Sequence, residues 1–172
     1  MRVSKGITRI AILLIVICNV GCDQISKTIV RNEIGYYENI KVYINNITLT
    51  KVENTGAFLS VGSVLPEFLK FILLILLPAI VLLTGLYFIL SKAKLSKLTI
   101  VGAAFVIGGG MGNLYDRIMF GSVTDFLHID FVIFQTGVFN FADVSIMIGM
   151  AMIVAAAYLN RRPATSIKPF NH

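Results

Sequence analysis

The sequence predicts an all-α integral membrane protein with four transmembrane helices, both termini cytoplasmic, and a small extracytoplasmic β-sheet between the first two helices. Three observations support this fold class. Of 172 residues, 56% are hydrophobic and only 14% are charged, which is far from the composition of soluble domains. Four apolar segments are long enough to cross a hydrocarbon core, for which a helix needs about 20 residues. The third observation is the distribution of charge along the chain.

We expect the four spans at about residues 10–30, 68–90, 98–115 and 141–159. Loops rich in Lys and Arg stay on the cytoplasmic side of a membrane. Nine of the fifteen basic residues fall in the two tails and the second connection, whereas all nine acidic residues fall on the other half. The net charge of +6 is therefore a topology signal, and we expect no nucleic-acid partner. The nine basic residues are Arg2, Lys5, Arg9, Lys92, Lys94, Lys97, Arg161, Arg162 and Lys168.

Two segments between the spans are expected on the outer side. In residues 31–67, apolar side chains alternate with polar ones on both sides of the turn signal Asn45-Asn46, from Ile40 and again from Ile47. This pattern predicts a β-rich loop containing a small sheet. Residues 118–139 are more apolar and contain four Phe, so we expect a loop in the membrane interface. We expect the whole chain, 1–172, to form a single domain.

Four aspartates stand at or near the outer ends of the predicted helices, and an ionisable group at membrane depth indicates a functional site. Asp23 and Lys27 are four residues apart on one helix face, so they can form an ion pair, and we expect Asp23 to have a supporting role. Asp116 is followed directly by Arg117, with Asn113 one turn before both. This spacing suggests a cluster of balanced charge.

Asp125 and Asp143 have no adjacent basic residue and stand among apolar residues. Burial without a cation raises the pKa of a carboxyl group, and two such groups brought together share a proton, so that one acts as an acid and the other as a base. Such a pair can activate water against a peptide carbonyl without a metal. Asn140 could share a helix face with Asp143 and orient a substrate carbonyl. The alternative is that each aspartate only caps a helix or turn, which is favoured for either one alone.

Three other function classes compete with a peptidase of this kind. A transporter would need a polar path into the inner halves of the helices, which are almost uniformly apolar. A Ser-Lys peptidase at Ser26 and Lys27 is disfavoured because adjacent helix positions point about 100° apart. A metal site at Asp125, His128 and Asp130 lacks a further ligand, so we expect no metal.

Five short motifs occur in an order that is typical of one family. They are DQISK, ENTGAF, GNLYDR, VTDF and FNFAD, and they extend from the first predicted helix to the fourth. Each is weak alone, but five in this order on four spans are specific. In this respect the chain resembles the lipoprotein signal peptidases, also called signal peptidase II or prolipoprotein signal peptidase.

The resemblance implies an aspartic endopeptidase of the bacterial plasma membrane, with its active site at the extracytoplasmic interface. Such an enzyme removes signal peptides from prolipoproteins and cuts just before the cysteine that carries diacylglycerol. The resemblance implies that Asp125 and Asp143 are catalytic, and that globomycin, a cyclic peptide, inhibits the enzyme. We expect no cofactor, and a monomer whose partners are lipidated prolipoproteins and membrane lipids. The family's supporting residues match Asp23, Lys27, Asn54, Gly56, Asn113, Arg117 and Asn140.

The N-terminal segment itself resembles a lipoprotein signal peptide, because basic residues and an apolar run precede Gly21 and Cys22. A cysteine that becomes lipidated needs an aliphatic residue three positions earlier, but Asn19 stands there. Cleavage would also separate the first helix from Asp23 and Lys27. We therefore expect the segment to remain as the first transmembrane helix.

Overall fold

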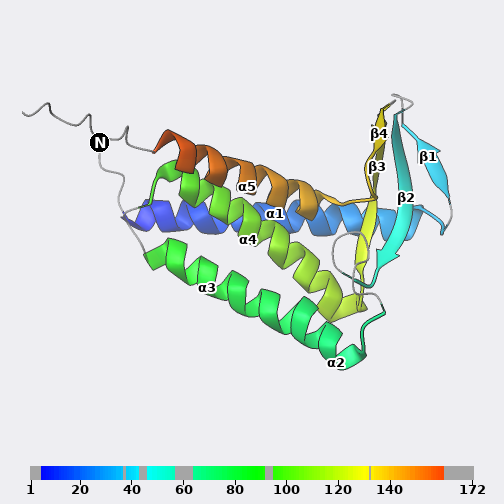
Figure 1. Cartoon of the computed structure of the whole chain (residues 1–172), viewed down its shortest axis with the longest axis horizontal. Helices are drawn as coiled ribbons and strands as arrows, with labels where there is room; N and C mark the ends of the chain where they lie inside the picture. The colour runs from blue at the N-terminus through cyan, green and yellow to red at the C-terminus, as the bar shows by residue number, and fades with distance from the viewer. Residues whose placement is uncertain are drawn as a thin grey trace, which may run out of the picture.

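A bundle of long helices with a β-sheet across one end forms the molecule (Figure 1). The computed structural model describes residues 5–36, 38–42, 46–56, 64–91, 95–131 and 133–160. The start of α1 and the end of α5 lie at the same end of the bundle, opposite the sheet (Figure 1). In chain order the elements are α1 (Lys5–Glu33), β1 (Asn39–Lys41), β2 (Ile47–Asn54), α2 (Glu67–Lys70), the π-helical segment η2 (Phe71–Leu76), α3 (Leu77–Ser91), α4 (Lys97–Phe120), β3 (Val123–Phe131), β4 (Phe134–Gln135) and α5 (Phe141–Leu159).

Within these described ranges, four helices are long and apolar enough to cross a membrane, which confirms the predicted number. The first and third helices continue past the predicted ends, to Glu33 and Phe120. The second span is continuous through α2, η2 and α3. Its π-helical turn lies directly before Leu77 and Pro78, where the missing N–H and the ring of proline disturb regular α-helical bonding. The four spans are Gly6–Glu33, Glu67–Ser91, Lys97–Phe120 and Phe141–Leu159.

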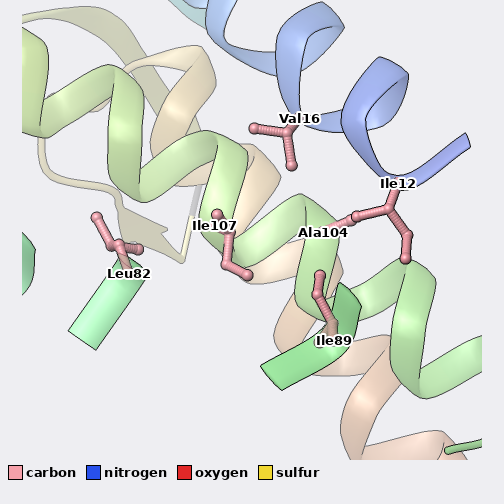
Figure 2. Packing of buried hydrophobic residues seen from close by; sticks show 6 residues of the cluster. All are labelled: Ile12, Val16, Leu82, Ile89, Ala104 and Ile107. Atoms are coloured by element: carbon pink, nitrogen blue, oxygen red, sulfur yellow. The ribbon is translucent and has the colours of Figure 1, made fainter. Parts of the chain in front are cut away.

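Helix α4 is the centre of the bundle, because it packs against α1, α3 and α5. Glycines allow the closest approach to α5: a Cβ atom on Gly109 would collide with the backbone oxygen of Ala142, and one on Gly149 with that of Gly102. Small residues at such contacts let helix backbones pack closely in a membrane. An apolar cluster with residues from α1, α3 and α4 fills the space between these three helices (Figure 2). It consists of Ile12, Val16, Leu82, Ile89, Ala104 and Ile107.

Of the basic residues that predict the topology, Arg9 lies at the bundle end away from the sheet, where its Nε donates to the backbone oxygen of Leu90 at 3.2 Å. Lys97 begins α4 at the same end (Figure 1). The side chain of Lys5 and the remaining six residues, Arg2, Lys92, Lys94, Arg161, Arg162 and Lys168, lie outside the described residues.

The sheet contains four strands in the order β1-β2-β3-β4, and all neighbours are antiparallel. Its first two strands form the predicted sheet between the first and second spans, although Asn45 of the expected turn lies outside the described residues. The segment 118–139 differs from the expected interfacial loop, because it contains the end of α4 and both β3 and β4. The first four residues of β3 are all buried. These four residues, Val-Thr-Asp-Phe, place two polar side chains together and so do not follow the apolar-polar alternation that predicts a half-buried strand.

A β-bulge in β2 sets the pairing of residues near the end of the bundle. Leu49 lies opposite Leu127, but Val52 lies opposite Asp125, so β2 contains one extra residue between these pairs. A shift of one residue moves side chains to the other face of a sheet. The bulge therefore places Asn54, two residues beyond Val52, on the same face as Asp125.

Candidate active site

Asp125 and Asp143 come together where the sheet meets the helix bundle, on either side of Asn140. Asp125 belongs to β3 and Asp143 to the first turn of α5. The Nδ2 atom of Asn140 donates to Oδ1 of Asp125 at 2.6 Å, and the backbone N–H of Asn140 donates to Oδ2 of Asp143 at 3.2 Å. The two carboxylates are therefore joined through a single residue.

Asp143 is held by the start of its own helix. Asn140 is the N-cap of α5, and its Oδ1 atom accepts from the backbone N–H of Asp143 at 3.0 Å. With the reverse bond from the Asn140 backbone, this forms a capping box. The other oxygen, Oδ1 of Asp143, accepts from Nδ2 of Asn113 at 2.8 Å. Asp143 thus takes part in capping α5, as the alternative interpretation required, and also belongs to the carboxylate cluster.

Asp125 receives its hydrogen bonds from two neutral amides. Asn54 Nδ2 donates to its Oδ2 atom at 3.1 Å, and Asn140 donates to its Oδ1 atom. The residue is only 4% exposed. Burial raises the pKa of Asp125 to about 6, and the negative charge of Asp143 adds to this effect, while the bonds from Asn54 and Asn140 oppose it. A carboxyl group that titrates near neutral pH is suited to proton transfer.

Lys27 is fully buried and lies next to this cluster, which it contacts through Asn113. Its Nζ atom contacts Oδ2 of Asp23 at 2.8 Å, Oδ2 of Asp116 at 2.9 Å and Oδ1 of Asn113 at 2.9 Å. The predicted ion pair of Asp23 with Lys27 is confirmed. These contacts occupy all three donors of the ammonium group, and the Ser26 hydroxyl donates to the backbone oxygen of Asp23 instead. The arrangement gives no support to a Ser-Lys peptidase.

Asp23 connects the first helix to the start of the last. Its Oδ1 atom accepts from the backbone N–H of Ala142 at 2.9 Å, next to Asp143. The adjacent position on α4 is glycine, and a Cβ atom on Gly112 would lie only 2.5 Å from Oδ2 of Asp23. Asp23 therefore fixes the position of the α5 N-terminus, as expected for a supporting residue.

Asp116 and Arg117 are close enough for their charges to attract each other, but they do not form the direct ion pair of the predicted cluster. Asp116 instead forms ion pairs with Lys27 and with Arg31, whose NH2 atom lies 2.8 Å from Oδ1 of Asp116. Adjacent residues on a helix point in different directions. Asp116 consequently faces α1, while Arg117 faces the segment that follows β2 and donates to the backbone oxygen of Gly56 at 2.9 Å.

The Asn54–Gly56 turn is tied to both Asp125 and α4. Oδ1 of Asn54 accepts from the backbone N–H of Gly56 at 3.0 Å, while Nδ2 of the same side chain donates to Asp125. Arg117 is close enough to Asp125 and Asp143 to attract both charges. Its buried Nε atom has no hydrogen-bond partner among the residues that the structure describes. All nine residues predicted for the site therefore lie in one connected region.

Several residues that complete this region were not predicted from the sequence. Arg31 follows Lys27 by one helical turn, so the spacing of Asp23, Lys27 and Arg31 at every fourth position would have revealed it. Glu53 and Thr124 carry no such signal, because their pairing depends on the bulge in β2.

The three residues considered for a metal site, Asp125, His128 and Asp130, are not grouped together. Asp125 and His128 are separated by an odd number of positions along β3, so their side chains point to opposite faces of the strand. Over the described part of the chain, no three His, Cys, Asp or Glu side chains are grouped closely enough to hold a metal ion.

A family model described as signal peptidase (SPase) II matches residues 14–159 of the chain. The chain belongs to this family. The lipoprotein signal peptidase of Buchnera aphidicola subsp. Schizaphis graminum (strain Sg) is 36% identical over 138 residues, which cover 80% of this chain and 87% of that protein. The lipoprotein signal peptidase of Clostridioides difficile (strain 630) is 36% identical over 141 residues, with coverage of 82% and 90%.

Two solved structures of bacterial membrane enzymes share the fold. One has a TM-score of 0.77 at 26% identity and covers 88% of this chain and 94% of that chain. The other has the same TM-score of 0.77 at 24% identity, with coverage of 92% and 94%. The family predicted from the five motifs is therefore confirmed. As a signal peptidase II, the chain is an aspartic peptidase, a multi-pass membrane protein that acts on the signal peptides of prolipoproteins.

Proposed function

We propose that this signal peptidase II cleaves the peptide bond just before the diacylglyceryl-modified cysteine of a prolipoprotein, with a water molecule activated between Asp125 and Asp143. One observation carries the proposal: Asn140 joins the two carboxylates, of which Asp125 is buried and has a pKa raised to about 6. In such a pair one carboxyl keeps a proton near neutral pH while the other is ionised.

The chemistry requires both protonation states at once. The ionised carboxylate takes a proton from water as the water oxygen attacks the scissile carbonyl carbon, and the protonated carboxyl donates to the carbonyl oxygen. The tetrahedral intermediate then breaks its C–N bond: the amine leaves with a proton from the pair, and one hydroxyl group of the intermediate returns a proton to the pair. The products are the free signal peptide carboxylate and the new amino group of the lipidated cysteine. The shared proton belongs to the pair as a unit.

The asparagines keep the pair in this geometry. Both amide hydrogens of Asn140 are used, toward Asp125 and toward Asn113. Asn140 therefore holds the carboxylates, and its amide has no hydrogen left for a substrate carbonyl, contrary to the expectation from the sequence. Arg117, with a buried Nε atom and a position near both carboxylates, is the better candidate to attract the substrate's peptide backbone.

The site lies at the sheet end of the bundle, and the basic residues at the other end favour a cytoplasmic location for that end. We place the active site at the extracytoplasmic face of the bacterial plasma membrane, where the substrate's acyl chains remain in lipid. The exposed rings of Phe120 and Phe141, at 52% and 46%, lie at the outer ends of α4 and α5 and fit an interface of this kind. The chain acts as a monomer with a single peptidase domain, and globomycin inhibits it.

Proteoliposomes that contain the purified chain test the reaction. A synthetic peptide with a diacylglyceryl cysteine is expected to be cut once, just before that cysteine, and the same peptide without lipid is expected to remain uncut. Mass spectrometry of both products identifies the broken bond. A chelator is expected to leave the rate unchanged, because carboxyl groups perform the proton transfers. Cleavage at another bond, or loss of activity with chelator, would contradict the proposal.

A further inference from the structure

Thr124, the residue directly before Asp125, is completely buried and bonded to two other elements. Its Oγ1 atom accepts from Nε of Arg31 at 2.9 Å and donates to Oε1 of Glu53 at 2.9 Å. Arg31 belongs to α1 and Glu53 to β2. A single hydroxyl group therefore connects the first helix, the second strand and the strand that carries Asp125.

Both partners of Thr124 are themselves held by other groups. The Arg31 guanidinium pairs with Asp116 and lies 4.0 Å from the centre of the Phe120 ring. The second carboxylate oxygen of Glu53 accepts from the Ser122 hydroxyl at 2.6 Å. The hydroxyl of Thr124 thus lies between a fixed cation and a fixed anion, and charged partners give the stronger hydrogen bonds.

The register of the sheet places this group beside the aspartate. Because of the bulge in β2, Glu53 lies opposite Thr124, and the next residue, Asn54, donates to Asp125. In addition, the backbone N–H of Thr124 is 3.4 Å from Oδ2 of Asp116. Two successive residues of β3 are therefore fixed by two successive residues of β2 and by the ion pairs of α1 with α4.

We propose that Thr124 is a positioning residue and that Arg31, Thr124 and Glu53 form a brace that fixes the Asp125 carboxylate for reaction. The inference rests on the proposed function, because the brace acts through Asp125. Side chains at successive strand positions point to opposite faces, so Thr124 does not face the substrate side of the sheet. Its influence on the reaction passes through the backbone of β3. The brace therefore affects turnover and not substrate affinity.

The test replaces Thr124 with valine, which keeps the shape of the side chain but removes the hydroxyl. Because small displacements of a reacting group have large effects on rate, kcat for the lipidated peptide is expected to fall roughly 10- to 100-fold. KM is expected to stay constant, so kcat and kcat/KM fall together, as for an interaction needed only in the transition state. Thr124→Ser, which keeps the hydroxyl, is expected to restore most of kcat.

The matched control is Thr136→Val, directly after β4. The Thr136 hydroxyl accepts from the backbone N–H of Ile129 at 2.9 Å and donates to the backbone oxygen of Ile129 at 3.2 Å. Neither bond involves Asp125. This variant is expected to lose thermal stability but to keep the wild-type kcat per folded molecule. The brace is overturned if Thr124→Val keeps the wild-type kcat, if Thr124→Ser fails to rescue it, or if both valine variants lose kcat equally.

Asp125→Asn, assayed beside these variants, separates the two proposals. If Asp125→Asn is inactive while Thr124→Val is fully active, the aspartate mechanism stands and only the brace is overturned. If Asp125→Asn keeps its turnover, the aspartate mechanism fails, and the brace fails with it.

Discussion

Asn140 donates to both carboxylates of the aspartate pair, to Asp125 through its side chain at 2.6 Å and to Asp143 through its backbone at 3.2 Å. The same side chain caps α5 through Oδ1. The beginning of a transmembrane helix and the spacing of two carboxyl groups thus depend on one residue. The helix cap and the carboxylate pair are one structure, so a change at Asn140 affects both.

Asn140→Ala is expected to impair both the cap and the pair, and a cap variant far from the site separates the two effects. Loss of an N-cap costs about 1 kcal/mol of stability, and loss of the link between the carboxylates is expected to lower kcat by about 100-fold. Ser96→Ala is the matched control, because Ser96 caps α4 through a 3.0 Å bond from Thr99 at the far end of the bundle. It should lose similar stability and keep its kcat. Equal kcat in the two variants would show that Asn140 is only a cap.

The buried charges beneath the pair give a prediction about stability. Lys27→Met leaves the buried carboxylates of Asp23 and Asp116 without their common cation, and removal of one partner of a buried ion pair costs about 3–5 kcal/mol. Asp23→Asn is expected to cost less, because Lys27 keeps its contacts with Asp116 and Asn113. Thermal unfolding in detergent measures both. A larger loss for Asp23→Asn than for Lys27→Met would show that Lys27 is not the centre of the cluster.

The raised pKa of Asp125 predicts how stability changes with pH. Between the ordinary value of 3.8 and about 6, the folded protein holds a proton that the unfolded chain has released. The stability that Asp125 contributes therefore decreases as pH rises through this window. Each pKa unit corresponds to about 1.4 kcal/mol, so we expect wild type to lose roughly 3 kcal/mol relative to Asp125→Asn, which has no titrating group there. Denaturation of both proteins between pH 4 and pH 7 in detergent is the measurement, and a constant difference would contradict the burial of Asp125.

Cys22 gives a prediction about the N-terminal segment. It is exposed on the surface of α1, next to the buried Asp23, and forms no disulfide in the structure. Because the segment is expected to remain a transmembrane helix, Cys22→Ser should keep its N-terminus and most of its activity. Intact-mass analysis of the wild-type protein should show a chain without diacylglycerol. A mature chain that begins with an acylated Cys22 would show that the segment is a cleaved signal peptide.

The sequence was sufficient to predict the features that depend on local spacing. Continuous apolar segments indicated the four spans, and the four-residue spacing of Asp23 and Lys27 indicated their ion pair. Features that depend on tertiary contacts were missed. Asp116 pairs with Arg31 across two helices and not with its sequence neighbour Arg117. The strand that carries Asp125 was expected to be a loop, because its buried first half, Val-Thr-Asp-Phe, does not alternate apolar and polar residues.

The aspartate mechanism is tested most directly by single-turnover cleavage of the lipidated peptide by Asp125→Asn and Asp143→Asn. Each amide keeps the size of the side chain but can act neither as a base nor as an acid. Because general acid-base catalysis contributes about 10²- to 10⁴-fold, each variant is expected to lose at least about 100-fold in rate while it remains folded. Asp130→Asn, at an exposed position on the same strand, is expected to cleave at the wild-type rate. A near-normal rate in either Asp125→Asn or Asp143→Asn would remove that residue from the pair and contradict the mechanism.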